Sequence, residues 1–367
     1  MARGTAEIDL GAIRRNCARL DAVASESLLC AVVKANGYGH GMIPVAKAAL
    51  EGGAAWLAVA AASEALELRE AGVGSPILVM GSVESGEVQS LVGSDCDFVV
   101  WTEEALGWAR SATGLARVHV KLDSGMGRLG TRDRSLALSL AEQTEADSGT
   151  ELVGVTTHFA TAESEDQTFL EEQNSLFAQF SESVKRFAPN VLAHAANSAA
   201  TLTRADTHHE MVRCGVAIYG LDPFQLDPST WGLQPAMRLT SRIASVELAQ
   251  AGDTVGYGRK FKAERPTWIA TVPFGYADGI SRHLGGKVEC LVGGLRVPIV
   301  GNVSMDNIAL DLGPETEAAV GDQVVLLGRD GEQLVLAEEW AAAAGTINYE
   351  IATGIGGRTE FVRRSHK

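Results

Sequence analysis

Short runs of apolar and β-branched residues alternate with longer amphipathic segments over roughly the first 230 residues of the chain. The run from Leu28 to Val33 predicts a strand, and the apolar spacing over 43–50 predicts a helix after it. Further strands are predicted at 56–59, 77–80, 98–100, 118–122 and 153–157, with weaker ones at 191–193 and 211–212. We expect a helix after each of the stronger strands, the longest over about 166–187, and we expect Ser63 to cap the helix that contains Leu66.

About eight strand–helix repeats in this span come close to the ~250 residues of a typical (β/α)₈ barrel. Residues 1–235 are therefore predicted to form a TIM-like α/β barrel, with a doubly wound open sheet as the alternative, because counting strands cannot show closure. After about residue 235 the pattern changes to strand-like runs separated by glycine turns, at 242–248, 268–272, 295–300, 308–312 and 324–327, and one helix at 337–344. Residues 236–367 are predicted to form a second, mostly β domain.

The charge balance argues against some classes of binding partner, and the cysteines argue against a zinc site or a disulfide framework. Aspartate and glutamate (46) outnumber lysine and arginine (31), and the resulting formal charge of −15 argues against nucleic acid or an anionic membrane as the main partner. The five cysteines are scattered and form no CxxC pair, so neither a zinc site nor a disulfide framework is indicated. The N-terminus shows no secretory signal and no apolar run reaches the ~20 residues of a membrane span. We expect a cytoplasmic protein.

Polar residues whose side chains could take part in catalysis follow several of the predicted barrel strands. In a parallel barrel these strand ends face the active site. Lys34 ends the run LCAVVK, where a lysine either extends its ammonium group to water or becomes a desolvated amine with a lowered pKa, suited to imine chemistry. The segment ANGYGHG that follows favours the second interpretation, because its glycines allow close approach of the backbone and the next helix start could receive an anion.

The segment VVKANGYGHG at 32–41 resembles the pyridoxal-phosphate lysine motif of the alanine racemase family. Other family motifs are matched in order along nearly the whole chain: AEIDLGAIRRN at 6–16, KLDSGMGRLG at 121–130, THFATAE at 157–163, HAANSAA at 194–200, RCGVAIYG at 213–220, VGYGR at 255–259, GYADG at 275–279, GNVSMDN at 301–307 and INYE at 347–350. The resemblance implies an isomerase that racemises alanine with pyridoxal 5'-phosphate, supplies D-alanine for peptidoglycan, and works as a head-to-tail homodimer with shared active sites.

The resemblance also implies roles for individual residues. Lys34 would bind the cofactor and act as one catalytic base, and Tyr257 from the β domain of the opposite subunit would act as the other. Arg128, with the backbone amide of Met305, would bind the substrate carboxylate. The expected cofactor contacts are Lys34, Tyr38, His158, Asn197, Ser198, Arg213, Gly215, Val216 and Tyr349. Supporting or entryway roles are expected for Lys121, Glu163, Tyr276, Arg282, Asn302 and Asp306, and no metal is expected.

Each role has a physical rationale and an ordinary alternative. Arg213 cannot give up its proton, so it would donate to the cofactor's ring nitrogen and weaken the electron sink, which favours reprotonation over transamination. Its alternative is a surface salt bridge. To act as a base, Tyr257 would need a pKa below the ~10 of a free tyrosine, and Arg128 and His158 are the candidates for lowering it. The alternative is that Tyr257 is a packing residue. Asn197 and Ser198 could simply cap a helix. Lys121 matches a lysine that is often carbamylated in relatives, with an ordinary ammonium as the alternative.

Two positions depart from the family pattern. Asn302 stands where most relatives carry arginine, and Glu163 where aspartate is common, so serine or another small amino acid is an alternative substrate. A decarboxylase of the same architecture is disfavoured, because the chain lacks the expected E-P-G-R segment and cysteine motif. A non-catalytic cofactor carrier is disfavoured as well, because such a carrier has no use for Tyr257. His40 and His194 lie within motifs but are expected to be structural.

Overall fold

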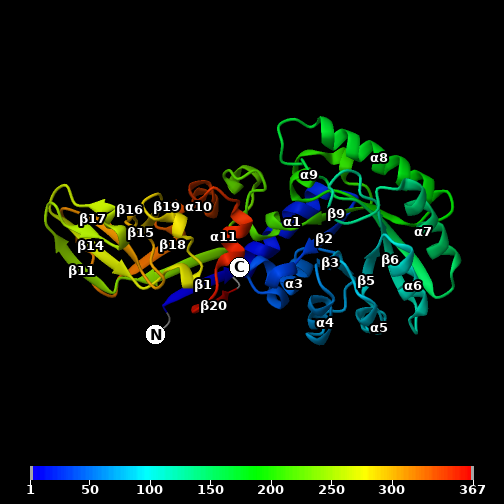
Figure 1. The fold of residues 1–367 in the computed structure, drawn as a ribbon, viewed down its shortest axis with the longest axis horizontal. Helices are drawn as coiled ribbons and strands as arrows, with labels where there is room; N and C mark the ends of the chain where they lie inside the picture. Colours follow the sequence, from blue (N-terminus) through cyan, green and yellow to red (C-terminus); the bar gives the residue numbers. More distant parts are fainter. Residues whose placement is uncertain (1–2, 365–367) are drawn as a thin grey trace. The chain divides into compact units, whose positions relative to one another are not determined.

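The computed structural model describes residues 3–364. Eight parallel strands close into a barrel in sequence order, which confirms the (β/α)₈ prediction over the open sheet (Figure 1). The barrel strands are β2 (Leu28–Val32), β3 (Trp56–Val59), β4 (Ile77–Val79), β5 (Asp97–Val100), β6 (Ala116–Lys121), β7 (Thr150–Thr156), β8 (Leu192–His194) and β9 (Met211–Cys214). These strands consist mainly of buried aliphatic residues, as expected for parallel strands that are covered on both faces.

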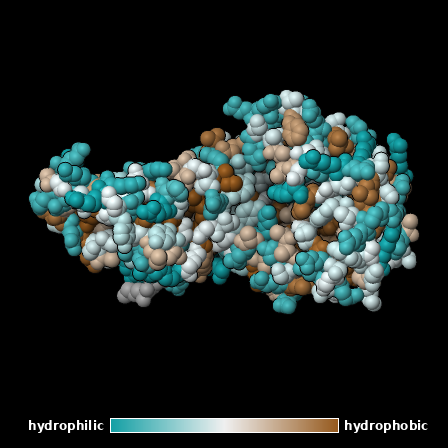
Figure 2. Space-filling model, viewed as in Figure 1, coloured by the Kyte–Doolittle hydropathy of each residue, from teal (hydrophilic) through white to brown (hydrophobic). Residues whose placement is uncertain are grey.

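Helices surround the barrel, and those that follow β2 connect its strands. They are α1 (Leu10–Ala24), α2 (Lys34–Tyr38), α3 (Met42–Glu51), α4 (Ala62–Glu70), α5 (Ser85–Gly93), α6 (Glu103–Ser111), α7 (Arg134–Ala146), α8 (Thr168–Lys185) and α9 (Ser198–Thr203). Helix α8 buries Leu170, Phe177 and Val184, which recur every seven residues along one stripe. Figure 2 shows hydrophilic residues over much of the outer surface around α7 and α8. The amphipathic pattern of the sequence therefore places these helices between the strands and solvent.

The predicted cap at Ser63 is wrong, because helix α4 begins one residue earlier, at Ala62. The carboxylate of Glu64 accepts hydrogen bonds from the backbone N–H groups of Ala60 (2.9 Å) and Ala61 (3.1 Å). These bonds stabilise the first turn from within the helix and leave Ser63 at a helical position.

The C-terminal part of the chain is mostly antiparallel β structure, as predicted. Its main sheet has the order β11-β14-β17-β16-β15-β18-β10-β1-β20, with β19 paired to β18 and a separate β12–β13 pair. The strands are β10 (Met237–Arg242), β11 (Ser245–Ala249), β12 (Thr254–Val255), β13 (Phe261–Lys262), β14 (Thr267–Val272), β15 (Glu289–Val292), β16 (Leu295–Val300), β17 (Ile308–Gly313), β18 (Gln323–Asp330), β19 (Gln333–Val335) and β20 (Thr359–Arg364). Helices α10 (Ala337–Ala344) and α11 (Asn348–Gly354) precede β20.

Two features of this sheet differ from the sequence-based expectation. The predicted strand at 242–248 is divided between β10 and β11, because the backbone N–H groups of Ile243 and Ala244 donate to different neighbours, Asp322 and Thr271. Strand β1 (Gly4–Asp9), which falls within the range expected for the barrel, instead pairs with β10 and β20 in the β sheet. Local periodicity does not reveal either change, since both depend on pairing between distant segments.

The chain forms two compact units. The first, called the barrel unit below, contains Ile13–Gly37 and Gly41–Ile218 and holds the barrel. The second, called the β unit, contains the described residues up to Ala12, the segment Tyr38–His40 and the described residues from Tyr219 onward. Among residues 3–364, no helix combines the length and apolarity that crossing a bilayer requires.

Candidate active site

The backbone directly after Lys34 forms a left-handed turn. Ala35, Asn36 and Gly37 have φ angles of 53°, 51° and 61°, and the N–H of Gly37 donates to the carbonyl of Val33 at 2.9 Å. A left-handed conformation costs roughly 1–2 kcal/mol for each residue that carries a Cβ atom. Conformational strain of this kind clusters at functional sites, where the surrounding structure maintains it.

Glu64 holds this turn, although it lies in none of the motifs recognised in the sequence. One carboxylate oxygen accepts the N–H of Ala35 at 2.6 Å, while the other accepts the N–H groups at the start of α4. Burial, and then the positive charge of Arg128, lower the pKa of Lys34 below its ordinary value, and Glu64 opposes this shift. A half-buried amine that loses its proton more readily than a free lysine agrees with the nucleophilic interpretation of Lys34.

Lys121 and Arg128 belong to one structured strand–loop segment. Lys121 is the last residue of β6 and is buried, and its pKa is lowered to about 8 by burial and by the charges of Arg213 and Arg128. The loop that carries Arg128 is folded around Asp123, whose carboxylate accepts the N–H groups of Gly125 and Gly127, both at 3.0 Å. Arg128 itself is exposed at the surface of this loop.

Arg213 lies inside the barrel unit and is only 5% exposed, which rules out the surface salt bridge. Its guanidinium group donates to Nδ1 of His194 (2.8 Å), Nδ1 of His158 (3.2 Å) and the carbonyls of Thr157 (2.8 Å) and Ala195 (3.1 Å). These acceptors are uncharged, and burial lowers the pKa of Arg213 to about 10. The pKa of His158 is held well below its ordinary value by burial and by Arg213, so the His158 ring is neutral.

Asn197 and Ser198 have different roles at the start of α9. Asn197 is the N-cap, because its side-chain oxygen accepts the N–H of Ala200 at 3.0 Å, as the ordinary alternative predicted. Its amide also donates to Glu163 at 3.3 Å. The hydroxyl of Ser198 points elsewhere and accepts the N–H of Gly215 at 3.0 Å. Ser198 is thus joined to the backbone segment that contains Gly215 and Val216.

The barrel unit therefore concentrates basic groups near the ends of β2, β6 and β9. Arg128 and Arg213 are both among the causes of the lowered pKa of Lys121, so these charges influence one another. A cluster of amines and guanidinium groups, together with hydroxyl and N–H groups around Ser198, suits an anionic ligand that carries a phosphate and an aldehyde. Within residues 3–364, no group of three histidine, cysteine or acidic side chains is arranged to hold a metal ion.

The β unit contains an aromatic cluster that includes two of the expected cofactor contacts. The rings of Tyr38 and Tyr219 stack with centroids 4.8 Å apart, and the Tyr349 ring lies 6.1 Å from that of Tyr38. Gly39, at φ 82°, allows this arrangement, because a Cβ atom there would lie 2.5 Å from the carbonyl oxygen of Ala352. The structure therefore brings together Tyr38 and Tyr349, which are more than 300 positions apart in the sequence.

Tyr257 lies in a short 3₁₀ turn, η4 (Tyr257–Arg259), between glycines at φ 74° and 75°. Its side chain is 72% exposed, which argues against the packing role considered for it. Its backbone carbonyl accepts a 2.6 Å hydrogen bond from the side-chain amide of Asn302. The backbone of this tyrosine is thus fixed while its ring remains accessible.

Met305 and Tyr276 lie on two loops of the β unit that bond to each other. The N–H of Tyr276 donates to the carbonyl of Ser304 (3.0 Å), and that of Ala277 to the carbonyl of Met305 (3.1 Å). Gly275 permits this approach, since a Cβ atom there would lie 2.4 Å from both carbonyl oxygens.

Arg358 joins these two loops, because it pairs with Asp306 at 2.7 Å and with the buried carboxylate of Asp278 at 2.9 Å. Asp306, for which a supporting role was expected, thus has a structural partner. Arg282, the remaining entryway candidate of this unit, is exposed in a short 3₁₀ turn, η6 (Arg282–Leu284).

The expected site residues thus fall into two groups, one in each unit. Those in the barrel unit are Lys34, Lys121, Arg128, His158, Glu163, Asn197, Ser198, Arg213, Gly215 and Val216. Those in the β unit are Tyr38, Tyr257, Tyr276, Arg282, Asn302, Met305, Asp306 and Tyr349. Glu64 and Arg358 were missed because their roles depend on contacts with backbone or side chains that no local motif specifies.

The chain combines a closed (β/α)₈ barrel with a mostly antiparallel β domain, and a desolvated lysine follows the first barrel strand. This combination defines a class of two-domain barrel enzymes. Residues 8–223 match the description "Alanine racemase, N-terminal domain", and residues 236–363 match "Alanine racemase, C-terminal domain". The chain belongs to the alanine racemase family, and it is therefore an isomerase.

Individual relatives resemble the chain over nearly its whole length. The alanine racemase of Beutenbergia cavernae is 42% identical over 368 residues, which cover 97% of each chain. The crystal structure of alanine racemase from D-cycloserine-producing Streptomyces lavendulae is similar with a TM-score of 0.94 and 38% identity, over 100% of this chain and 98% of that one. The alanine racemase of Bacillus anthracis with bound L-Ala-P gives a TM-score of 0.90 and 38% identity, over 100% of this chain and 96% of that one.

Proposed function

We propose that this protein interconverts L-alanine and D-alanine with pyridoxal 5'-phosphate as its cofactor. The observation that carries the proposal is the amine of Lys34, which has a lowered pKa and follows a barrel strand in a strained turn. The basic surroundings of this amine suit the phosphate of the cofactor and the carboxylate of an amino acid. Membership of the alanine racemase family supports the choice of reaction.

The residues of the barrel unit would hold the cofactor at two places. Ser198 and the N–H groups of Gly215 and Val216 would bind the phosphate, with Asn197 as a further contact. Tyr38 and Tyr349, which belong to the β unit, are the other contacts expected for the cofactor. Arg213 would donate to the ring nitrogen, and His158, which accepts from Arg213, would support it. When bound, the cofactor supplies an electron sink for charge that develops at the substrate's α-carbon. An arginine keeps its own proton, so Arg213 limits this sink and favours return of a proton to the α-carbon.

Two bases would act on opposite faces of the α-carbon. Lys34 would remove or return the proton on one face, and the hydroxyl of Tyr257 would do so on the other. Arg128 would hold the substrate carboxylate with its planar guanidinium group, assisted by the N–H of Met305.

Lys121, once carbamylated, would hold Arg128 in place. The pKa of Lys121 of about 8 leaves part of it as a neutral amine near neutral pH, and this is the form that reacts with carbon dioxide. Carbamylation would give Lys121 a negative charge suited to pairing with Arg128.

The second base would come from another copy of this chain, in a head-to-tail homodimer. Tyr257 is the most exposed large hydrophobic side chain among residues 3–364, and Met305 and Tyr276 are also exposed. A fixed but exposed tyrosine, in a unit that exposes further apolar side chains, suits a site completed by a partner subunit. On this proposal residues 1–235 carry the cofactor and residues 236–367 supply Tyr257 to the partner. The enzyme would work in the cytoplasm and provide D-alanine for peptidoglycan.

Incubation of the cofactor-loaded protein with L-alanine in deuterated water tests the reaction. Loss of optical rotation together with deuterium at the α-carbon is expected. Release of carbon dioxide would indicate a decarboxylase, and bound cofactor without turnover would indicate a carrier, so either result would overturn the proposal. Repeating the incubation with L-serine measures substrate preference, which Asn302 and Glu163 leave open.

A further inference from the structure

Strand β6 carries three polar side chains on one face. Residues two apart along a strand point to the same side, so Arg117, His119 and Lys121 share a face. The His119 ring contacts Trp56 of β3 at a centroid distance of 5.6 Å and His194 of β8 at 5.0 Å. Neither strand is a neighbour of β6 in the barrel. These contacts cross the barrel interior, so His119 lies inside it.

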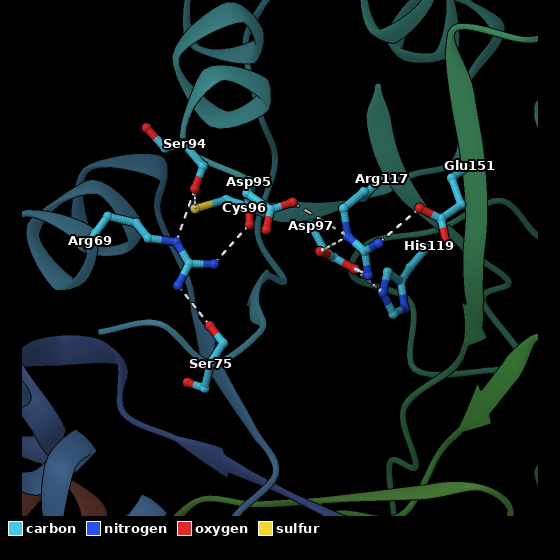
Figure 3. Close-up of polar contacts among 9 residues, drawn as sticks. All are labelled: Arg69, Ser75, Ser94, Asp95, Cys96, Asp97, Arg117, His119 and Glu151. Atoms are coloured by element: carbon cyan, nitrogen blue, oxygen red, sulfur yellow. Dashed lines mark hydrogen bonds and ion pairs between the residues drawn. The ribbon is translucent and has the colours of Figure 1, made fainter. Parts of the chain in front are cut away.

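A chain of buried hydrogen bonds runs through this interior to Arg213. Nη1 of Arg213 lies 2.8 Å from Nδ1 of His194, and Nε2 of His194 lies 2.8 Å from Nδ1 of His119. Nε2 of His119 lies 3.1 Å from Oδ2 of Asp97, whose other oxygen accepts from Nε of Arg117 at 2.8 Å. The side chains of Asp97, His119 and His194 are all fully buried. Figure 3 shows the end of this chain at Asp97, Arg117 and His119.

The direction of every hydrogen bond in the chain is determined by its two ends. Arg213 can only donate, so Nδ1 of His194 must be an acceptor and the single proton of this neutral ring must lie on Nε2. The pKa of His194 is held well below its ordinary value by burial and by Arg213, which keeps the ring neutral. His194 therefore donates to Nδ1 of His119, and His119 donates from Nε2 to the carboxylate of Asp97. One arrangement of protons satisfies all these contacts.

A glycine on the neighbouring strand leaves space for the His119 ring. Gly154 lies within β7 opposite His119, and a Cβ atom at position 154 would lie 2.3 Å from Nδ1 of His119. Glycine in a strand interior weakens the strand and often marks a close approach. The glycine thus preserves the position of the nitrogen that must accept from His194.

We infer that Asp97 and His119 are positioning residues that act on Arg213 through His194, by fixing the tautomer of His194. The fixed tautomer gives the buried guanidinium group of Arg213 an acceptor on one side. Its remaining donors are then directed by His158 and the carbonyls of Thr157 and Ala195. The consequence for catalysis rests on the proposed function, in which Arg213 meets the cofactor's ring nitrogen.

The substitution Asp97→Asn tests this inference with little change in shape. Arg117 donates to Oδ1 of Asp97 through Nε at 2.8 Å and to Oδ2 through Nη2 only at 3.4 Å. The shorter bond should keep the carbonyl of the asparagine on Nε of Arg117 and turn its NH₂ group toward His119. Nε2 of His119 would then become an acceptor, and His119 would donate from Nδ1 to His194. His194 would carry its proton on Nδ1, where it faces an N–H of Arg213. Two donors in contact would displace the guanidinium group.

The tautomers can be read directly by ¹⁵N NMR of the holoenzyme with labelled histidines, and the His194 signals are those that disappear in His194→Gln. In the wild-type protein we expect His194 to be protonated on Nε2 and unprotonated on Nδ1. In Asp97→Asn we expect the reverse. A wild-type His194 that is protonated on Nδ1, or a His194 tautomer that Asp97→Asn leaves unchanged, would overturn the inference. This readout does not depend on which reaction the enzyme catalyses.

Kinetics supply the second readout. We expect Asp97→Asn to lower kcat by about tenfold or more in both directions, equivalent to about 1.4 kcal/mol, with the alanine KM within about twofold because Arg128 is untouched. The matched control is Glu151→Gln, since Glu151 pairs with Arg117 at 2.8 Å but lies near the surface. His119→Phe keeps the ring volume and removes the relay, so it should also lower kcat. Wild-type kcat in folded Asp97→Asn, or equal losses in Glu151→Gln, would contradict the inference.

Discussion

The side-chain amide of Asn302 donates a 2.6 Å hydrogen bond to the backbone carbonyl of Tyr257. This bond connects the loop of the GNVSMDN motif to the turn that presents the tyrosine. The family resemblance predicts arginine at position 302, yet the contact of Asn302 here is with the backbone of the proposed second base. We interpret Asn302 as a residue that positions Tyr257, in addition to the entryway role expected for it.

Replacing Asn302 by aspartate should reduce turnover. The substitution removes the donor and places a carboxylate against the carbonyl of Tyr257, so the turn should shift. We expect kcat to fall about tenfold, which corresponds to the loss of one hydrogen bond of about 1.4 kcal/mol. Asn307→Asp makes the same change of charge at an exposed position of the same loop and serves as the control. Equal effects of the two variants on kcat would show that the contact with Tyr257 has no role.

Ser198→Ala should weaken cofactor binding. Its hydroxyl oxygen accepts from the backbone of Gly215, and its loss removes both that support and a proposed phosphate donor. We expect the Kd for pyridoxal phosphate to rise about tenfold, as expected for about 1.4 kcal/mol. Spectroscopic titration of cofactor-free protein measures the change, with Thr203→Ala on the same helix as control. An unchanged Kd would exclude Ser198 from the phosphate site.

Lys121 should make stability rise with pH in buffer free of carbon dioxide. In the unfolded chain this lysine keeps its proton up to about pH 10.5, whereas in the folded protein its pKa is about 8. Between these values the unfolded state binds more protons, so the free energy of unfolding increases with pH. From pH 8 to pH 10 we expect wild type to gain about 2 kcal/mol more than Lys121→Met, as measured by urea unfolding. Identical gains would contradict the lowered pKa.

Arg213→Glu should increase transamination. A glutamate can share a proton with the ring nitrogen, which strengthens the electron sink and prolongs the charge at the α-carbon. Pyruvate formed per racemisation event should therefore exceed the wild-type value. The variant should also be less stable, because glutamate would face the carbonyls that accept from Arg213. A folded variant with no increase in pyruvate would count against the role of Arg213.

The local hydrophobic pattern of the sequence predicted where the helices and strands lie better than it predicted which strands pair with each other. The barrel strands were predictable because each is a short apolar run, and helix α10 was predicted at its observed bounds of 337–344. The pairing of β1 with β10 and β20 was not predictable, because a six-residue strand contains no information about which distant strand it joins. The cap of α4 was missed because Glu64 acts from inside the helix.

Residues of the candidate site could be proposed from the sequence where motifs carry them, and not where their roles depend on contacts across the fold. Lys34, Arg128 and Arg213 stand in recognisable segments, and the structure gives each a specific environment. His194 was expected to be merely structural, yet it is the direct acceptor of Arg213. Its partner His119 belongs to no motif in the sequence, and neither does Asp97. Only the closure of the barrel brings these side chains together.

The central claim is racemisation by two bases, Lys34 and Tyr257, on opposite faces of the α-carbon. The most direct test is α-proton exchange by Tyr257→Phe in deuterated water, starting separately from L-alanine and D-alanine. The account predicts that the variant still binds the cofactor and that one enantiomer still exchanges its α-proton, without inversion, while the other does not exchange. Racemisation of both enantiomers at near wild-type rates would contradict the account.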